Sequence, residues 1–209
     1  MVTLQTHPNP PMLYDYFGFP PETYTVQYPA PGNPALAEEI EVLLKENGIA
    51  SAQDNKRGFD HGHFIPLRMM YPQANIPTFQ ISLIKGLDPT AHLKLGEALR
   101  PLMEREILVI GSGFSFHNMR AFSWSPDNQP DPLNDAFQDW LIDTCATQDD
   151  YSRLSANLQA WSQAPGARYA HPREEHLMPL MVCAGLGTGK ADLIFDDYIL
   201  GKRGVAFGW

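Results

Sequence analysis

The first clear hydrophobic pattern of the chain has the spacing of a helix and follows an aromatic, proline-rich stretch over residues 1–32. The prolines of that stretch favour an ordered loop. Apolar residues recur at helical spacing from Leu36 onward, and Asn33 and Pro34 precede them as N-cap and first helical residue. Gly48 follows the last of these residues as a terminator. We therefore predict a helix from Asn33 to Gly48.

Farther along, short apolar runs alternate with helical patterns. Residues 78–83 (TFQISL) are typical of a strand, and Asp88 with Pro89 opens a second helix that Pro101 interrupts. Residues 106–111 (EILVIG) form a short apolar run that ends in glycine, which is the pattern of a strand buried on both faces. This alternation of strand and helix is typical of βαβ units.

The last third of the chain continues the pattern. Asp131 and Pro132 open a third helix, and residues 150–163 carry the apolar stripe of a fourth. Residues 191–195 and 204–207 are predicted to form closing strands. Together these elements predict an α/β fold with a central sheet flanked by helices on both faces.

Composition narrows the class of protein and its partners. The 209 residues are 44% hydrophobic, enough to bury the core of one domain, and their formal net charge is −9. Because no Lys/Arg cluster can neutralise phosphates, we expect no binding to nucleic acid or anionic membrane. Cys145 and Cys183 lie far apart in apolar contexts, which fits a reducing compartment. With no secretory signal pattern and no membrane-spanning run, we expect a cytoplasmic protein.

Five of the seven histidines lie within three short motifs. Neutral imidazole is both the usual proton shuttle near neutral pH and a common metal ligand. The three motifs are residues 58–63 (GFDHGH), 111–118 (GSGFSFHN) and 171–176 (HPREEH). This concentration of imidazole indicates a polar, catalytic pocket.

The middle motif places His117 in a loop at the carboxyl end of the predicted strand 106–111, where ligands of open α/β sheets gather. That position suits a general acid/base. The alternative is a loop histidine that is hydrogen-bonded to backbone. The glycines do not have Gly-x-Gly-x-x-Gly spacing, so the motif does not predict a dinucleotide site.

The first motif contains a His-x-His pair, His61 and His63. On an extended strand such residues lie on one face and can share an ion. A zinc hydrolase would need two further ligands, but apolar residues 64–67 follow instead. A pocket role for His61 without metal is therefore favoured, with Asp60 able to orient its ring.

In the third motif we predict a helix beyond Pro172 that carries Glu175 and His176. Glu174 or Glu175 is then expected to stabilise the positive end of that helix. Apolar residues 177–180 follow His176 and partly bury it. A buried histidine needs a partner, which is either a hydrogen bond or a metal.

Taken in order, these motifs resemble the class III extradiol ring-cleaving dioxygenases, in particular the 4,5-DOPA dioxygenase-like branch. The matching stretches are residues 14–20, 28–32, 58–62, 70–72, 76–77, 111–118, 175–176 and 179–180. The resemblance implies an enzyme that uses non-haem Fe(II), or Zn(II), and inserts O2 to open a catechol-type aromatic ring. The oligomeric state stays open, and a homo-oligomer is one of the alternatives.

Matched residue by residue, the resemblance implies that His176 is a metal ligand and His117 the acid/base. It implies that His61 is a second pocket histidine that hydrogen-bonds substrate or oxygen, and it gives His63 no role.

Two further metal-ligating histidines of the family belong to N-terminal strands that would lie upstream of Met1. We therefore expect residues 1–209 to form a single extradiol dioxygenase-like catalytic domain, incomplete at its N-terminus, with an incomplete metal site. The alternative to a truncated dioxygenase is a catalytically inactive aromatic-binding or partner subunit of the same fold.

Overall fold

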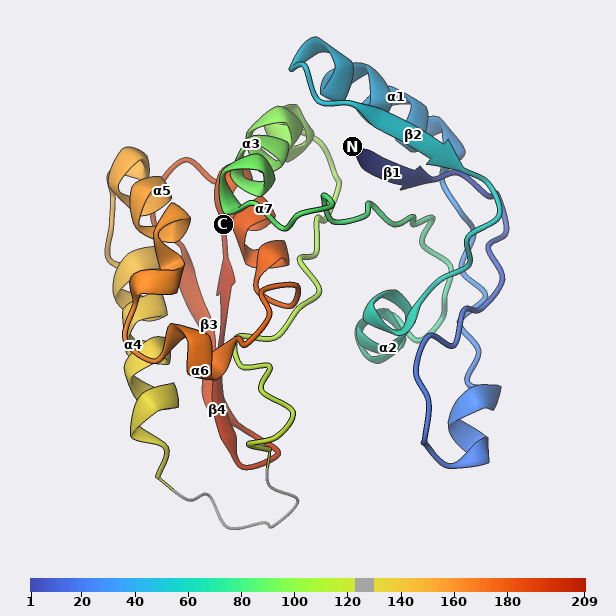
Figure 1. Cartoon of the computed structure of the whole chain (residues 1–209). Helices are drawn as coiled ribbons and strands as arrows, with labels where there is room; N and C mark the ends of the chain where they lie inside the picture. The colour runs from blue at the N-terminus through green and yellow to red at the C-terminus, as the bar shows by residue number, and fades with distance from the viewer. Residues whose placement is uncertain (123–129) are drawn as a thin grey trace. The chain divides into compact units, whose positions relative to one another are not determined.

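The computed structural model describes residues 1–122 and 130–209, and the chain divides into two compact units, Met1–Lys85 and Gly86–Trp209 (Figure 1). Helices and strands occur in both units, and among the described residues each unit holds one two-stranded sheet. The predicted α/β class is confirmed, with its strands in these two small sheets. A single domain over residues 1–209 stays a prediction.

The first unit contains a βαβ element. It consists of β1 (Val2–Gln5), α1 (Pro34–Glu46) and β2 (Ser51–Asp54), with the two strands paired in parallel. Val2 and Leu4 of β1 are fully buried. A parallel pair needs a crossover connection, and the amphipathic α1 supplies it.

The prediction for α1 is confirmed at both ends. The Asn33 side chain accepts a hydrogen bond from the backbone N–H of Leu36 at 3.2 Å, as an N-cap does. Gly48 follows the helix with a φ of +69°, a backbone conformation that glycine adopts without steric cost.

The free edge of β1 lies beside residues 80–82. The backbone N–H of Gln5 donates to the carbonyl of Gln80 at 3.0 Å, and the N–H of Ser82 donates to the carbonyl of Thr3 at 2.9 Å. Only an isolated antiparallel bridge, between Leu4 and Ile81, forms there. The predicted strand over 78–83 is therefore wrong in extent, because its hydrogen-bonding to β1 stops after one bridge.

Aromatic residues form the second core of this unit, next to α2 (His61–Met70) and the short 3-10 helix η1 (Pro21–Thr25). Tyr28, Phe59 and Phe64 are buried together. Burial of three aromatic side chains contributes several kcal/mol, on the order of 2 each. This cluster holds the segment that leads into α2.

The second unit is mainly helical. Its elements before the final hairpin are α3 (Pro89–Leu99), η2 (Arg100–Glu104), α4 (Pro132–Ala146), α5 (Tyr151–Gln159), η3 (Trp161–Gln163), α6 (Ala167–Ala170) and α7 (Met178–Leu186). The predicted helix starts are confirmed, since Asp88, Asp131 and Asp150 each accept a first-turn backbone N–H. The predicted helix over 150–163 is interrupted, because α5 ends at Gln159 and η3 follows.

Two glycines let α3 and α7 approach each other closely. A Cβ on Gly96 would lie 2.0 Å from the carbonyl oxygen of Val182, and one on Gly185 would lie 2.1 Å from that of Leu93. No side chain fits at these distances. α7, the helix that follows the third histidine motif, therefore packs against α3 with backbone against backbone.

A hairpin closes the chain, as predicted. β3 (Asp192–Ile199) pairs antiparallel with β4 (Lys202–Gly208), and α4 packs against β4, as Figure 1 also shows. The Arg203 guanidinium on β4 contacts Asp196 at 2.6 Å and Asp139 of α4 at 2.8 Å. These contacts join the hairpin to the helix.

Two further predictions are wrong. Residues 106–111 do not form a strand, and within the described ranges no strand pairs with them; Leu108 is 61% exposed. A strand needs a neighbouring strand to satisfy its backbone groups, whatever its apolar content.

The predicted helix does not include Glu175 and His176. These two residues lie in a turn, because α7 begins only at Met178. Pro179 is tolerated in the first turn of a helix but would break an interior turn.

Across the ranges given above, no helix combines the length and apolar character that crossing a bilayer requires.

Candidate metal and acid/base site

Two glycines bring the loop of His117 against the turn that carries His176. A Cβ on Gly113 would lie 2.3 Å from the carbonyl oxygen of His176, and one on Gly111 would lie 2.8 Å from that of Pro179. The N–H of Phe114 donates to the carbonyl of His176 at 3.1 Å. The Gly-Ser-Gly sequence therefore permits a close approach of two backbone segments.

The other side of the loop is tied to α6. The backbone N–H of His117 donates to the carbonyl of Ala170 at 2.8 Å, and the Asn118 side-chain amide donates to the carbonyl of Tyr169 at 2.9 Å. Both flanks of the His117 backbone are therefore held by hydrogen bonds to segments more than 50 residues away in sequence.

Ser115 connects this loop to three elements. Its hydroxyl accepts a hydrogen bond from the N–H of Val205 in β4 at 2.8 Å. Its carbonyl accepts hydrogen bonds from Gln138 Nε2 of α4 at 3.1 Å and from His171 Nε2 at 2.9 Å. Ser115, Gln138 and His171 are all buried. Buried hydrogen bonds of this kind fix a backbone conformation strongly, since breaking one leaves a desolvated polar group.

His171 has a structural role that the sequence did not indicate. Burial lowers its pKa from 6.5 to about 4, although the hydrogen bond to the Ser115 carbonyl opposes the shift. The ring is therefore neutral near pH 7, and Nε2–H is the donor to Ser115. Its Nδ1 is buried and makes no hydrogen bond within the described residues. The motif contained this histidine, but no local signal separated it from His176.

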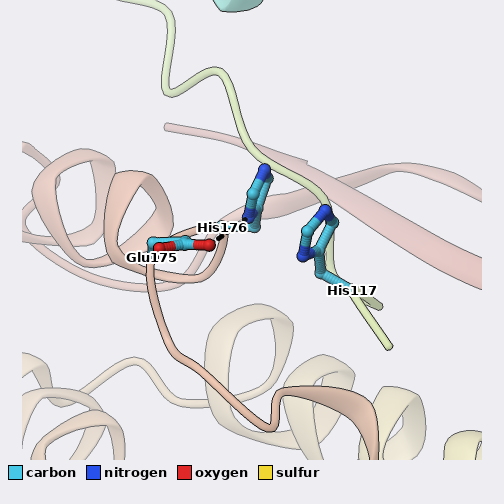
Figure 2. A group of neighbouring side chains, drawn as sticks. All are labelled: His117, Glu175 and His176. Carbon is cyan, nitrogen blue, oxygen red and sulfur yellow. Dashed lines mark ion pairs between the residues drawn. The ribbon is translucent and has the colours of Figure 1, made fainter. Parts of the chain in front are cut away.

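His117, Glu175 and His176 form a compact group (Figure 2). One ligand atom from each lies within 4.8 Å of the others, and all three side chains are partly buried. The Glu175 carboxylate lies 3.7 Å from Nδ1 of His176, and its other oxygen accepts from Arg173 at 2.8 Å. Two imidazoles and a carboxylate are donors that suit Fe(II) or Zn(II).

The two imidazole rings are stacked. Their centroids are 3.3 Å apart and their planes differ by 15°. A metal is bound through the in-plane lone pair of a ring nitrogen at about 2.0–2.1 Å, and the lone pairs of parallel rings do not converge on one point. This arrangement fits one ring as a ligand and the other as a neighbour in proton transfer.

His61 lies in the first unit, at the start of α2, and Asp15 orients its ring. The Asp15 carboxylate oxygen lies 2.7 Å from Nδ1 of His61 and accepts from its backbone N–H at 3.0 Å. Asp60, which we expected in this role, instead pairs with Arg57 at 2.7 Å. The prediction for Asp60 is wrong, because its carboxylate is bonded to Arg57 and the carboxylate of Asp15 occupies the ring nitrogen.

His63 does not share a face with His61. It lies on α2, where residues two apart point in different directions, and the extended strand assumed for a His-x-His metal pair is absent. Its buried ring stacks on Phe59 at 3.8 Å and lies 3.1 Å from the Thr78 hydroxyl. Burial lowers its pKa to about 4, against the influence of Asp60. The His-x-His metal interpretation is therefore wrong.

Of the three residues predicted for the site, the structure brings His117 and His176 together and adds Glu175. His61 belongs to the unit Met1–Lys85, with its own carboxylate partner. Glu175 was expected only at a helix end, and the signal for its placement was its position immediately before His176.

The fold and this histidine pair define a class of protein. Residues 2–208 match the family described as the catalytic LigB subunit of aromatic ring-opening dioxygenase. The chain belongs to this family, the class III extradiol dioxygenases, as its motifs indicated.

Relatives narrow the branch. The chain is 40% identical to a 4,5-DOPA dioxygenase extradiol of Beta vulgaris over 196 residues, covering 89% of this chain and 69% of the relative. It is 39% identical to Dioxygenase tasH of Hapsidospora irregularis over 209 residues, covering 94% of this chain but only 64% of that relative. The crystal structure of uncharacterized protein JW3007 from Escherichia coli K12 is similar with a TM-score of 0.78 and 26% identity, covering 98% of this chain and 78% of that one.

Proposed function

We propose that the chain acts as a non-haem, metal-dependent extradiol dioxygenase that inserts O2 into a catechol-type ring. Membership of the ring-opening dioxygenase family and the names of the 4,5-DOPA dioxygenase relatives support the reaction class. The observation that carries the proposal is the stacked pair of His117 and His176 beside Glu175.

In this proposal His176 is the metal ligand and Glu175 the neighbouring carboxylate. When bound, Fe(II) would supply the redox chemistry of O2 and would bind the catechol; Zn(II) could bind the catechol but has no redox chemistry. A mononuclear Fe(II) site usually takes two histidines and a third donor on one face. The proposal therefore requires at least one histidine donor beyond His176.

His117 is the general acid/base in this scheme. Its ring stacks on that of His176, so a catechol bound beside His176 would bring a hydroxyl near His117. His117 takes the proton from that hydroxyl and returns it as the ring opens, which requires an approach of about 2.6–3.2 Å in the complex. The buried hydrogen bonds of Ser115 hold the His117 loop in one conformation before substrate binds. The reaction therefore costs little conformational entropy in this loop.

His61 is the second pocket histidine, hydrogen-bonded to substrate or oxygen. Its exposed ring and its short contact with Asp15 suit that role, because a carboxylate at one ring nitrogen defines which nitrogen faces outward.

The test is metal analysis combined with oxygen consumption on a panel of catechols. We expect about one Fe(II) per chain after anaerobic loading, and ring-opened product in proportion to the O2 consumed. Protein that binds catechol but retains no iron and consumes no O2 would contradict the proposal. That outcome would favour the alternative, a catalytically inactive aromatic-binding or partner subunit.

A further inference from the structure

The side chains of Asp15 and His61 form a carboxylate–imidazole pair, which joins two of the stretches that match the family, residues 14–20 and 58–62. One oxygen of Asp15 lies 2.7 Å from Nδ1 of His61 and also accepts the backbone N–H of the same residue at 3.0 Å. The two hydrogen bonds fix the ring relative to its own backbone. An exposed histidine would otherwise rotate among several positions.

Backbone contacts bring Asp15 to this position. Residues 11–13 run beside Phe59, whose N–H donates to the carbonyl of Pro11 at 2.8 Å and whose carbonyl accepts from Leu13 at 2.8 Å. A Cβ on Gly58 would lie 2.2 Å from the Pro11 carbonyl oxygen, so this approach requires glycine. The N–H of Asp15 then donates to the carbonyl of Leu13 at 3.1 Å, which turns its side chain toward α2.

The electrostatics favour an ionised carboxylate in this pair. Desolvation raises the pKa of Asp15, but the hydrogen bonds from the His61 backbone and ring outweigh it, and the net pKa lies below its usual value. An ionised carboxylate accepts hydrogen bonds only, so the proton of a neutral ring must sit on Nδ1. The opposite nitrogen, Nε2, then carries the lone pair.

Aromatic side chains complete the surroundings of the ring. Tyr16 stands edge-on to His61 with centroids 6.0 Å apart, and its hydroxyl donates to the carbonyl of Thr23 at 2.6 Å. Tyr14 donates to the carbonyl of Val26 at 2.7 Å. Because these two hydroxyls donate to backbone carbonyls, neither competes with Asp15 for Nδ1 of His61.

We infer that Asp15 is a positioning residue, which holds His61 in the Nδ1–H tautomer and leaves Nε2 as the nitrogen that faces substrate. The tautomer depends only on the contact between Asp15 and His61. The effect of the tautomer on turnover rests on the role of His61 in the proposed function. An imidazole in the wrong tautomer presents a donor where a base is needed.

The first test reads the tautomer by long-range ¹H–¹⁵N correlation on metal-free protein labelled in histidine, at a pH where the rings are neutral. His61→Gln identifies the signals of His61. We expect a protonated Nδ1 and an unprotonated Nε2 in the unchanged protein. Asp15→Ala should shift the ring toward a mixture of tautomers, whereas Asp15→Asn, which keeps an acceptor oxygen, should retain more of the Nδ1–H form.

Asp60→Asn is the matched control, because the Asp60 carboxylate bonds to Arg57 and not to the ring. We expect its His61 ring signals to equal those of the unchanged protein. Identical ring signals in Asp15→Ala and in the unchanged protein would overturn the inference. So would a loss of the Nδ1–H form in Asp60→Asn alone.

The second test measures turnover of catechol by the iron-loaded protein. We expect Asp15→Ala to lower kcat by roughly 10- to 100-fold with a smaller change in KM, in line with losses at partners of catalytic histidines. The same substitution added to His61→Ala should cause no further loss. If His61→Ala alone keeps full turnover, the catalytic role of His61 fails, while the tautomer measurement still decides whether Asp15 sets its ring.

Discussion

The two glycine–histidine motifs, residues 58–63 and 111–118, lie in separate units and are both held by a close backbone contact at a glycine. In each, a glycine allows another segment to approach at backbone distance: Gly58 beside Pro11, and Gly113 beside His176. Each motif also involves one buried structural histidine: His63 lies within the first motif, and His171 donates to the carbonyl of Ser115 in the second.

The difference between the two regions lies in what each accessible imidazole contacts. His61 is held by a carboxylate at 2.7 Å, whereas His117 is stacked at 3.3 Å on a second imidazole, with the nearest carboxylate of the group turned toward Arg173 and His176. A carboxylate at hydrogen-bond distance defines a tautomer. A stacked imidazole contacts the face of its neighbour and not its in-plane nitrogens, so it does not define the tautomer of that neighbour. The first arrangement orients a ring, and the second sets a ring beside the proposed metal ligand, His176.

The largest effect is expected from His176→Ala. If this ring holds the metal, iron content measured by elemental analysis should fall to background, and turnover should fall with it. Glu174→Gln is the control from the same turn, since its carboxylate pairs with Arg168 at 2.9 Å. Full iron loading of His176→Ala would contradict the ligand assignment.

His117→Ala tests whether the stacked rings have different roles. As an acid/base, His117 should contribute roughly 10²- to 10⁴-fold to turnover, while iron content stays unchanged. Single-turnover measurement of ring opening separates this loss from weaker substrate binding. If iron is lost from this variant as fully as from His176→Ala, both rings are ligands and the comparison drawn above fails.

The two buried histidines, His63 and His171, should make the stability of both regions fall at acidic pH. The pKa values of His63 and His171 fall from 6.5 to about 4 in the folded state. Their stabilising contribution is therefore complete above pH 6.5 and is lost as the pH falls from 6.5 toward 4, to the extent of about 3 kcal/mol for each residue. Urea unfolding of His171→Phe should show a weaker fall over this interval than that of the unchanged protein. Equal slopes would mean that His171 is not neutral and buried.

The smallest effects are expected from the two glycines. Gly58→Ala and Gly113→Ala should each lower the free energy of unfolding by about 1–3 kcal/mol, because a Cβ would meet a backbone carbonyl at 2.2 or 2.3 Å. At Gly208 the nearest atom to a Cβ is 3.7 Å away, so Gly208→Ala should change stability by no more than about 0.5 kcal/mol. Denaturant midpoints of the three variants check this. Equal midpoints for Gly58→Ala, Gly113→Ala and Gly208→Ala would contradict the close backbone contacts at Gly58 and Gly113.

Local signals predicted much of the helical structure. Asn33, Asp88, Asp131 and Asp150 each accept a first-turn N–H as expected, since a cap acts within three residues of itself. Residues 106–111 failed as a strand for the opposite reason. An apolar run contains no information about whether another strand lies beside it.

The sequence by itself determined where most helices begin, which family the motifs resemble and which histidines are candidates for the site. Only the tertiary structure decided that Glu175 joins His117 and His176, that His171 holds Ser115, and that Asp15 rather than Asp60 contacts His61. The physical reason is range. Caps and helix breakers act on their own neighbours in sequence. The partner of an imidazole comes from a distant backbone segment, which glycine contacts and buried hydrogen bonds bring close; Asp15 and His61 are 46 residues apart.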